Sequence, residues 1–288
     1  AKRAVTDALD AGYTHFDCAH CYNNERAVGE GLQAAKRPRE ELYVTSKLWN
    51  TKHRADQVVG ALRHTLAQLN LDYVDLYLIH WPLAFAPTEL HSENFPRRDD
   101  GSGPVYDFEL SFCETWRGME EAHALGLAKS IGLSNFNSKQ IDAILAMATV
   151  RPVVNQVECH PLLPQKELLS FCRERGIALV AYSPLGSPDA TGRKADDPSL
   201  LTDERILAIG RAYGRSAAAV LVRFQTQRGI AAIPKSKTKE YLADNLAAGA
   251  FDLSDEHLAE LEAMGCGYRF GGCTRDSEHP LWPFNEYF

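Results

Sequence analysis

The chain alternates short apolar runs with segments of helical periodicity. The runs are rich in β-branched and aromatic residues, which favour strands, and apolar residues between them recur every three or four positions, as from Val58 to Leu69 and from Ile141 to Ala148. Nearly continuous apolar strands alternating with helices predict an α/β fold with a parallel sheet, because parallel strands need crossover connections and are buried on both faces. The seven predicted strands lie at residues 14–19, 42–49, 73–81, 128–135, 153–158, 177–185 and 229–236.

Helix-end signals agree with this periodicity. Asn137 with Gln140 three residues later matches a capping box, and Thr238 and Ser254 stand where N-caps belong. The opening helical pattern ends at Gly12, as helices often end at a glycine.

Two parallel architectures are compatible with the pattern, the open doubly wound sheet and the closed TIM barrel. The nearest match to a dinucleotide-binding glycine motif, Gly29 and Gly31, lies inside a helical segment, which argues against the open sheet. The (β/α)8 barrel is favoured because its active site assembles at the carboxyl ends of the strands. We expect its first strand to be missing ahead of residues 4–12. Polar residues follow nearly every predicted strand: Asp17, Lys47, His80, Ser134, Asn135, Gln156, Tyr182 and Lys235.

Length and composition restrict the function classes. We expect one barrel domain over residues 1–288, with 265–288 as a C-terminal substrate loop and 82–109 as a lid or specificity loop. A net charge of -7 disfavours nucleic acid and anionic membranes as partners, and no apolar run of about 18 residues predicts a membrane span. Seven scattered cysteines indicate a reducing compartment, so we expect a cytoplasmic monomer.

The stretch FDCAHCYNNE offers two kinds of chemistry. Cys18 and Cys21 form a C-x-x-C, which in other settings binds a metal or cycles a disulfide, but no second pair of ligands lies at a suitable spacing. A structural or incidental role is favoured for both, and we expect no metal. Asp17 and Tyr22 suit acid–base catalysis instead, since a nearby cation such as Lys47 would lower the pKa of a tyrosine.

Seven short motifs follow one another along the chain: FDCAHCY, TSKLW, LYLIHWP, IGLSNFN, QVECHP, AYSPLGS and IPKS. Through these motifs and their order the chain resembles the aldo-keto reductases, and most closely their aldehyde reductase and aldose reductase branch. The resemblance implies NADPH-dependent reduction of small-molecule aldehydes, and of some ketones, with a tyrosine as the general acid. It places the catalytic tetrad on Asp17, Tyr22, Lys47 and His80. It places the cofactor contacts on Ser134, Asn135, Gln156, Tyr182, Ser183, Leu185, Ser187, Lys235, Ser236, Thr238 and Asn245.

One position departs from the family pattern. Tyr241 stands where an arginine usually binds the 2′-phosphate of the cofactor, and a phenol cannot reproduce the two-pronged contact of a guanidinium. Lys235 and Lys237 would still neutralise the phosphate. We therefore expect NADPH as the cofactor, with some use of NADH.

Three tryptophans and an arginine are candidates for the substrate site. Trp49, Trp81 and Trp282 would supply apolar walls, together with His80 as a donor to the carbonyl oxygen. The resemblance aligns Arg275 with an arginine that favours carboxylate-bearing aldehydes such as uronates, although an exposed surface arginine is the alternative. Two rival functions stay open, a non-catalytic relative with a structural or regulatory role and, more weakly, a metal-dependent hydrolase.

Overall fold

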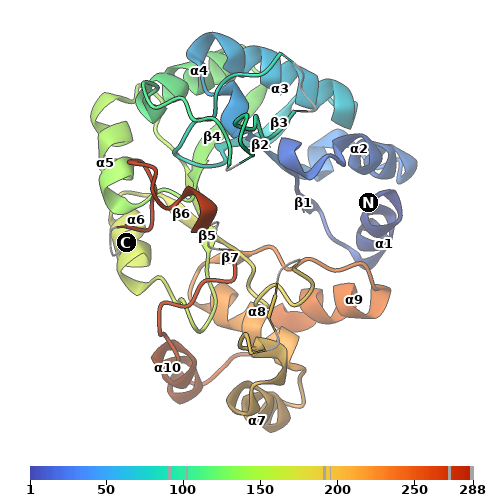
Figure 1. The fold of residues 1–288 in the computed structure, drawn as a ribbon. Coiled ribbons are helices and arrows are strands. Elements are labelled where there is room, and N and C mark those ends of the chain that lie inside the picture. The colour runs from blue at the N-terminus through green and yellow to red at the C-terminus, as the bar shows by residue number, and fades with distance from the viewer. Residues whose placement is uncertain (90–92, 102, 191–192, 195, 272–273, 286–288) are drawn as a thin grey trace. The chain divides into compact units, whose positions relative to one another are not determined.

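Helices and strands alternate over residues 2–182, and two of the described α-helices follow each of the last two strands (Figure 1). The computed structural model describes residues 1–89, 93–101, 103–190, 193–194, 196–271 and 274–285. The strands are β1 (His15–Asp17), β2 (Tyr43–Leu48), β3 (Val74–Ile79), β4 (Ala128–Ser134), β5 (Val154–Glu158), β6 (Ala178–Tyr182) and β7 (Ala231–Ala232). The α-helices are α1 (Lys2–Ala11), α2 (Glu25–Ala34), α3 (Ala55–Leu69), α4 (Phe112–Ala124), α5 (Ser138–Met147), α6 (Lys166–Glu174), α7 (Glu204–Tyr213), α8 (Ala217–Gln227), α9 (Lys239–Ala247) and α10 (Asp255–Ala263).

The strands form a parallel sheet in chain order, from β1 to β7. Within the first four strands, Lys47 pairs with Leu78 and Ile79 with Leu133. This register brings the carboxyl ends of neighbouring strands to one edge of the sheet. The α/β class and all seven predicted strands are confirmed.

Two strands are shorter than their apolar runs. β6 ends at Tyr182 because Ser183 adopts a left-handed conformation with φ of 51°. β7 is only Ala231–Ala232, and Pro234 follows, which lacks the backbone N–H that a longer ladder would need. Apolar composition therefore overestimates strand length where a turn residue follows.

The described chain divides into two compact units. The first comprises Ala1–Asn155, Glu174–Ile177 and residues 274–285. Its helices α2 and α3 pack closely, because a Cβ added at Gly29 would lie 2.4 Å from the backbone oxygen of Leu69. The two glycines of the false dinucleotide motif are thus helix residues, as the periodicity indicates.

The second unit comprises Gln156–Arg173 and the described part of 178–272. Its core is formed by apolar faces of α7, α8 and α10, with Ile206, Phe224 and Leu261 fully buried. The single-domain organisation of the whole chain stays a prediction.

The helix-end predictions are mostly confirmed. Asn137 and Gln140 form a complete capping box at α5, the Ser254 hydroxyl accepts from a backbone N–H of α10, and Gly12 ends α1 with φ of 104°. Thr238 is the N-cap residue of α9, but its side chain makes no capping hydrogen bond.

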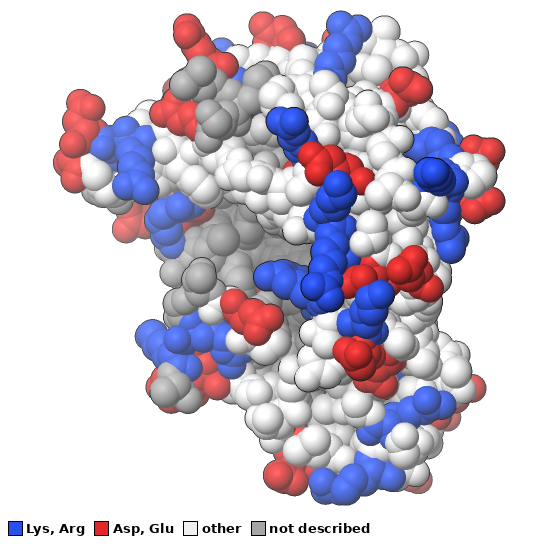
Figure 2. Space-filling model, turned by 90° about the vertical axis from the view of Figure 1, so that its right-hand side faces the viewer, with Lys and Arg blue, Asp and Glu red and all other residues white. Residues whose placement is uncertain are grey.

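The surface carries a mixture of charges. On the face drawn in Figure 2, acidic side chains lie beside many of the basic ones. Between α1 and α2, Glu30 lies 3.5 Å from Lys2, and within α2 it lies 3.8 Å from Arg26. Among the helices of the described residues, none is both long and apolar enough to cross a membrane.

Candidate active site

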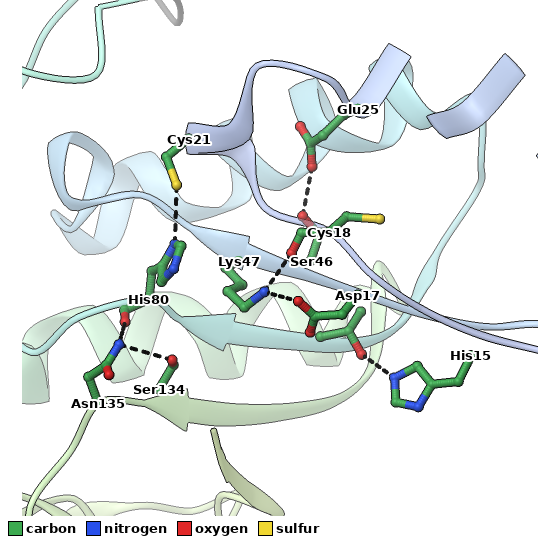
Figure 3. Close-up of polar contacts among 11 residues, drawn as sticks. His15, Asp17, Cys18, Cys21, Glu25, Ser46, Lys47, His80, Ser134 and Asn135 are labelled. Carbon is green, nitrogen blue, oxygen red and sulfur yellow. Dashed lines mark hydrogen bonds and ion pairs between the residues drawn. The ribbon is translucent and has the colours of Figure 1, made fainter. Parts of the chain in front are cut away.

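A buried ion pair joins the ends of β1 and β2 in the first unit. Lys47 is fully buried, forms an ion pair with Asp17 and donates to the backbone oxygen of Cys18 at 2.8 Å (Figure 3). Burial lowers the pKa of Lys47, but the Asp17 carboxylate and Tyr22 more than offset this effect, so the pKa lies above its usual value. Lys47 is therefore a fixed cation at neutral pH.

Tyr22 lies next to this cation, at the end of a short 3-10 helix (His20–Tyr22) that follows β1. The Lys47 ammonium nitrogen is 5.3 Å from the centre of the Tyr22 ring. Although 49% of Tyr22 is exposed, loss of water around its hydroxyl raises its pKa to about 12. Lys47 acts in the predicted direction, but the prediction of a lowered pKa is wrong because desolvation exceeds the attraction of the cation. The phenol is thus protonated at neutral pH.

His80 follows the carboxyl end of β3 and is also buried. Burial, together with the Lys47 cation and His53, holds the pKa of His80 well below its usual range. Its ring is in edge contact with Trp49, at 5.3 Å between centres, and with Tyr22, at 6.0 Å. A neutral imidazole therefore lies beside the phenol.

Ser134 and Asn135 mark the end of β4, next to His80. Both are buried, and Asn135 has a left-handed φ of 62°. The Asn135 amide donates to the backbone oxygen of His80 at 3.0 Å and to the Ser134 hydroxyl at 3.2 Å (Figure 3). The ends of β1 to β4 thus bring together the tetrad and two of the predicted cofactor residues.

Glu25 is a site-supporting residue that the sequence prediction missed. This first residue of α2 is buried, and its carboxylate accepts from Ser46 at 2.7 Å and from Thr65 at 3.1 Å. It thereby links the loop that carries Tyr22 to β2 and α3. No sequence signal could have shown this role, because an acidic residue in the first turn of a helix is usually solvated.

The three predicted tryptophans come together in an aromatic cluster of the first unit. The buried members of this aromatic cluster are Trp49, Trp81, Leu83, Phe85 and Trp282. Trp81 and Trp282 stack with their ring centres 5.8 Å apart, and the Trp49 indole donates to the backbone oxygen of Asn94 at 2.6 Å. The 82–109 segment therefore contributes to the aromatic cluster. Its role as a lid or specificity loop stays a prediction, and its residues 90–92 and 102 lie outside the described part.

Arg275 lies at the edge of the aromatic cluster. Its guanidinium is 5.0 Å from the ring centre of Phe95 and 5.9 Å from that of Phe85. Two of its nitrogens donate to Asp276, at 2.8 and 2.9 Å, and Tyr106 donates to the same carboxylate at 2.7 Å. Arg275 is close to the aromatic rings, but part of its charge is already paired. The sequence did not indicate Tyr106 or Asp276.

The two cysteines of the C-x-x-C motif differ in burial and in their neighbours. Cys18 is buried, and burial raises the pKa of its thiol. Cys21 is partly exposed, packs against the aromatic cluster, and lies with its sulfur 3.6 Å from Nδ1 of His80. Across the residues that the structure describes, no group of three or more His, Cys, Asp or Glu side chains could hold a metal ion.

The second unit carries the remaining predicted cofactor residues. Ser183 and Ser187 both have positive φ, 51° and 45°, and their hydroxyls are 2.6 Å apart. Asn245 is buried with both polar atoms of its amide lacking a partner. Gln156 is buried, Tyr182, Leu185 and Ser236 are partly buried, and Lys235 and Thr238 are exposed.

The residues of the second unit can be compared with the groups that a dinucleotide cofactor presents. A buried amide such as that of Asn245 is costly unless a hydrogen-bonding group meets it. The adenine ring of a dinucleotide offers such groups, and the exposed Lys235 and Lys237 could meet a phosphate. Tyr241 is 66% exposed, and the Asp244 carboxylate accepts from Ser216 at 2.5 Å. The residues present therefore fit a nicotinamide dinucleotide.

Comparison with known proteins gives consistent matches. A model described as the aldo/keto reductase family matches residues 1–265. Aldo-keto reductase family 1 member A1 from Cricetulus griseus is 47% identical over 299 residues, covering 99% of this chain and 91% of that protein. The human protein of the same name is 47% identical, with 99% and 90% covered.

Solved structures extend the similarity to the fold. An aldo-keto reductase from Bombyx mori, in complex with NADP, matches with a TM-score of 0.88 at 38% identity, covering 98% of this chain and 88% of that one. The aldose reductase from Schistosoma japonicum matches with a TM-score of 0.91 at 36% identity, covering 100% and 91%. These neighbours confirm the predicted α/β barrel class.

Proposed function

Because the chain belongs to the aldo/keto reductase family and is therefore an oxidoreductase, we propose that it reduces aldehydes to alcohols with NADPH. The tetrad is the observation that carries this proposal. A buried cation lies 5.3 Å from the ring of a protonated tyrosine, and a neutral histidine lies beside that ring. This arrangement suits protonation of a carbonyl oxygen by a positioned general acid.

Reduction adds a hydride to the carbonyl carbon and a proton to the oxygen. When bound, NADPH supplies the hydride. Tyr22 donates the proton, since its phenol is protonated at neutral pH, and Lys47 stabilises the phenolate that remains. His80 donates a hydrogen bond from its neutral imidazole to the carbonyl oxygen and orients it. Asp17 keeps Lys47 charged and in place.

We propose the cofactor contacts from both the resemblance and the local geometry. Ser134, Asn135 and Gln156 would bind the carboxamide, and Asn245, whose buried amide lacks a partner, would bind the adenine. Lys235 would neutralise the 2′-phosphate as a point charge, and Thr238 and Ser236 would flank it. Tyr182 would stack on the nicotinamide, and Ser183, Leu185 and Ser187 would follow the pyrophosphate.

Cofactor preference can be measured by titrating the protein with each reduced cofactor. We expect NADPH to bind more tightly than NADH, with a modest ratio because Tyr241 replaces the usual arginine. Lys235→Met should weaken NADPH binding about tenfold and leave NADH binding unchanged. Lys166→Met is the matched control, because that lysine pairs with Glu262 at 3.0 Å. Equal dissociation constants for the two cofactors would remove the NADPH preference.

The aromatic cluster and Arg275 suggest the substrate class. Aromatic walls favour apolar or aromatic aldehydes, and a guanidinium beside them favours an anionic tail, as in uronates or carboxylated aromatic aldehydes. Arg275→Met should raise the KM for a carboxylated aldehyde about threefold to tenfold and leave the KM for its neutral analogue unchanged. An equal effect on both substrates would contradict a role in charge recognition.

The decisive test is turnover by the protein and by Tyr22→Phe. Loss of NADPH absorbance is followed with benzaldehyde and 4-carboxybenzaldehyde as substrates. Tyr22→Phe should lower kcat by about 10²–10⁴-fold, the usual contribution of a general acid, with cofactor binding unchanged. Tyr43→Phe, on the partly exposed start of β2, is the control and should leave kcat unchanged. Cofactor binding without turnover in the parent would favour the non-catalytic rival.

A further inference from the structure

The C-x-x-C motif has no role in the reaction described above, yet the structure treats its two cysteines differently. Cys18 is 2% exposed, whereas Cys21 is partly exposed and packs against the aromatic cluster. The sulfur of Cys21 lies 3.6 Å from Nδ1 of His80, within hydrogen-bonding distance for a thiol (Figure 3). Cys21 also directly precedes Tyr22 in the chain. It therefore contacts one tetrad residue and is bonded to another.

The contact matters because a neutral imidazole carries only one N–H. The tautomer with its proton on Nε2 can donate from that nitrogen, and the other tautomer cannot. The backbone of His80 is held by its own N–H to Leu48 at 3.2 Å and by the Asn135 amide at 3.0 Å. For the ring nitrogens, the polar contact seen among the described residues is the Cys21 thiol. The Cys21 thiol is therefore a polar group through which the protein can favour one tautomer over the other.

We propose that Cys21 is a positioning residue for carbonyl reduction: its thiol donates to Nδ1 of His80 and keeps the imidazole proton on Nε2, where it meets the carbonyl oxygen. This inference rests on the proposed function. If the proton were on Nδ1 instead, the sulfur would accept it and Nε2 would repel the carbonyl oxygen. Thiols are weak donors, so the expected effect is modest. Loss of the donor should lower kcat about threefold to tenfold, within the range of one neutral hydrogen bond.

The test compares Cys21→Ser, which keeps a donor, with Cys21→Val, which keeps an apolar side chain without one. Nitrogen-15 NMR of the histidine-labelled protein reports the tautomer directly, with the His80 signals assigned from His80→Gln. We expect Nε2 protonated in the parent and in Cys21→Ser, and a mixture of tautomers in Cys21→Val. With benzaldehyde, kcat should fall in Cys21→Val alone. Cys113→Val, a thiol loss in α4, should change neither readout.

Three results would overturn the inference. The first is a parent protein with the proton on Nδ1, which needs no variant and so does not depend on how the variants fold. The second is Cys21→Val with unchanged tautomer and kcat. The third is equal loss in the serine and valine variants, which would indicate shape rather than hydrogen bonding. Failure of the proposed function can be distinguished from failure of this inference. If the parent protein were inactive, NMR would still show whether the proton of His80 is on Nε2 and whether the tautomer changes in Cys21→Val.

Discussion

The buried ion pair of Asp17 and Lys47 allows a quantitative prediction. The exposed fractions of the two side chains are 8% and 0%, so neither charge is well hydrated in the folded protein. Replacing one partner, as in Lys47→Met or Asp17→Asn, leaves the other charge buried without the ion pair that joins them. Such losses cost about 3–5 kcal/mol of unfolding free energy, compared with a total of about 5–15 kcal/mol for a typical protein. We expect the Tm to fall by roughly 6–20 °C in each single variant.

The double variant distinguishes pairing from mere burial. Because neither charge remains, Asp17→Asn/Lys47→Met should lose less stability than the sum of the single variants, with a coupling energy of about 2 kcal/mol or more. Urea unfolding monitored by circular dichroism measures all four proteins. Lys2→Met is the matched control, since Lys2 pairs with Glu30 at an exposed site, and should change stability by no more than about 0.5 kcal/mol. Additive single-variant losses, within about 0.5 kcal/mol, would refute the reasoning.

Three further predictions concern packing, pH and specificity. Gly29→Ala should destabilise the protein by about 1–3 kcal/mol in thermal melts, because the added Cβ would lie 2.4 Å from a backbone oxygen of α3. Gly60→Ala, where the Cβ meets nothing within 4 Å, should stabilise it by about 0.5–1 kcal/mol, and the opposite order would contradict this account. Burial lowers the pKa of His53 to about 3, whereas the unfolded-state pKa is about 6.5. Between these two values the unfolded chain binds a proton that the folded protein does not, so the free energy of unfolding decreases as the pH falls from about 6.5 towards 3. In urea unfolding at several pH values, His53→Gln should reduce the slope of the unfolding free energy against pH by about 1.4 kcal/mol per pH unit. An unchanged slope would exclude a neutral buried His53. Asp276→Asn should lower the KM for carboxylated aldehydes about threefold by freeing Arg275, and an equal change for neutral aldehydes would argue against charge recognition.

The sequence determined the fold class and indicated which residues are candidates for acid–base catalysis. Each of these predictions depends on a local feature: apolar runs indicated all seven strands, the residue types Asn137 and Gln140 indicated the capping box of α5, and helical periodicity placed Gly29 in a helix. The carboxyl ends of the strands in a parallel sheet lie at one edge, and from this rule the sequence predicted that Asp17, Lys47 and His80 are near one another. The cytoplasmic location and the monomeric state stay predictions.

Only the tertiary structure decided the electrostatics and the supporting contacts. Whether desolvation or the Lys47 cation controls the pKa of Tyr22 depends on how much water reaches the hydroxyl, and sequence spacing carries no such information. The hydrogen-bond partners of Glu25 and Cys21 lie 21 to 59 positions away in the sequence. The sequence thus sets which groups are available, whereas burial and long-range packing set their protonation states and partners.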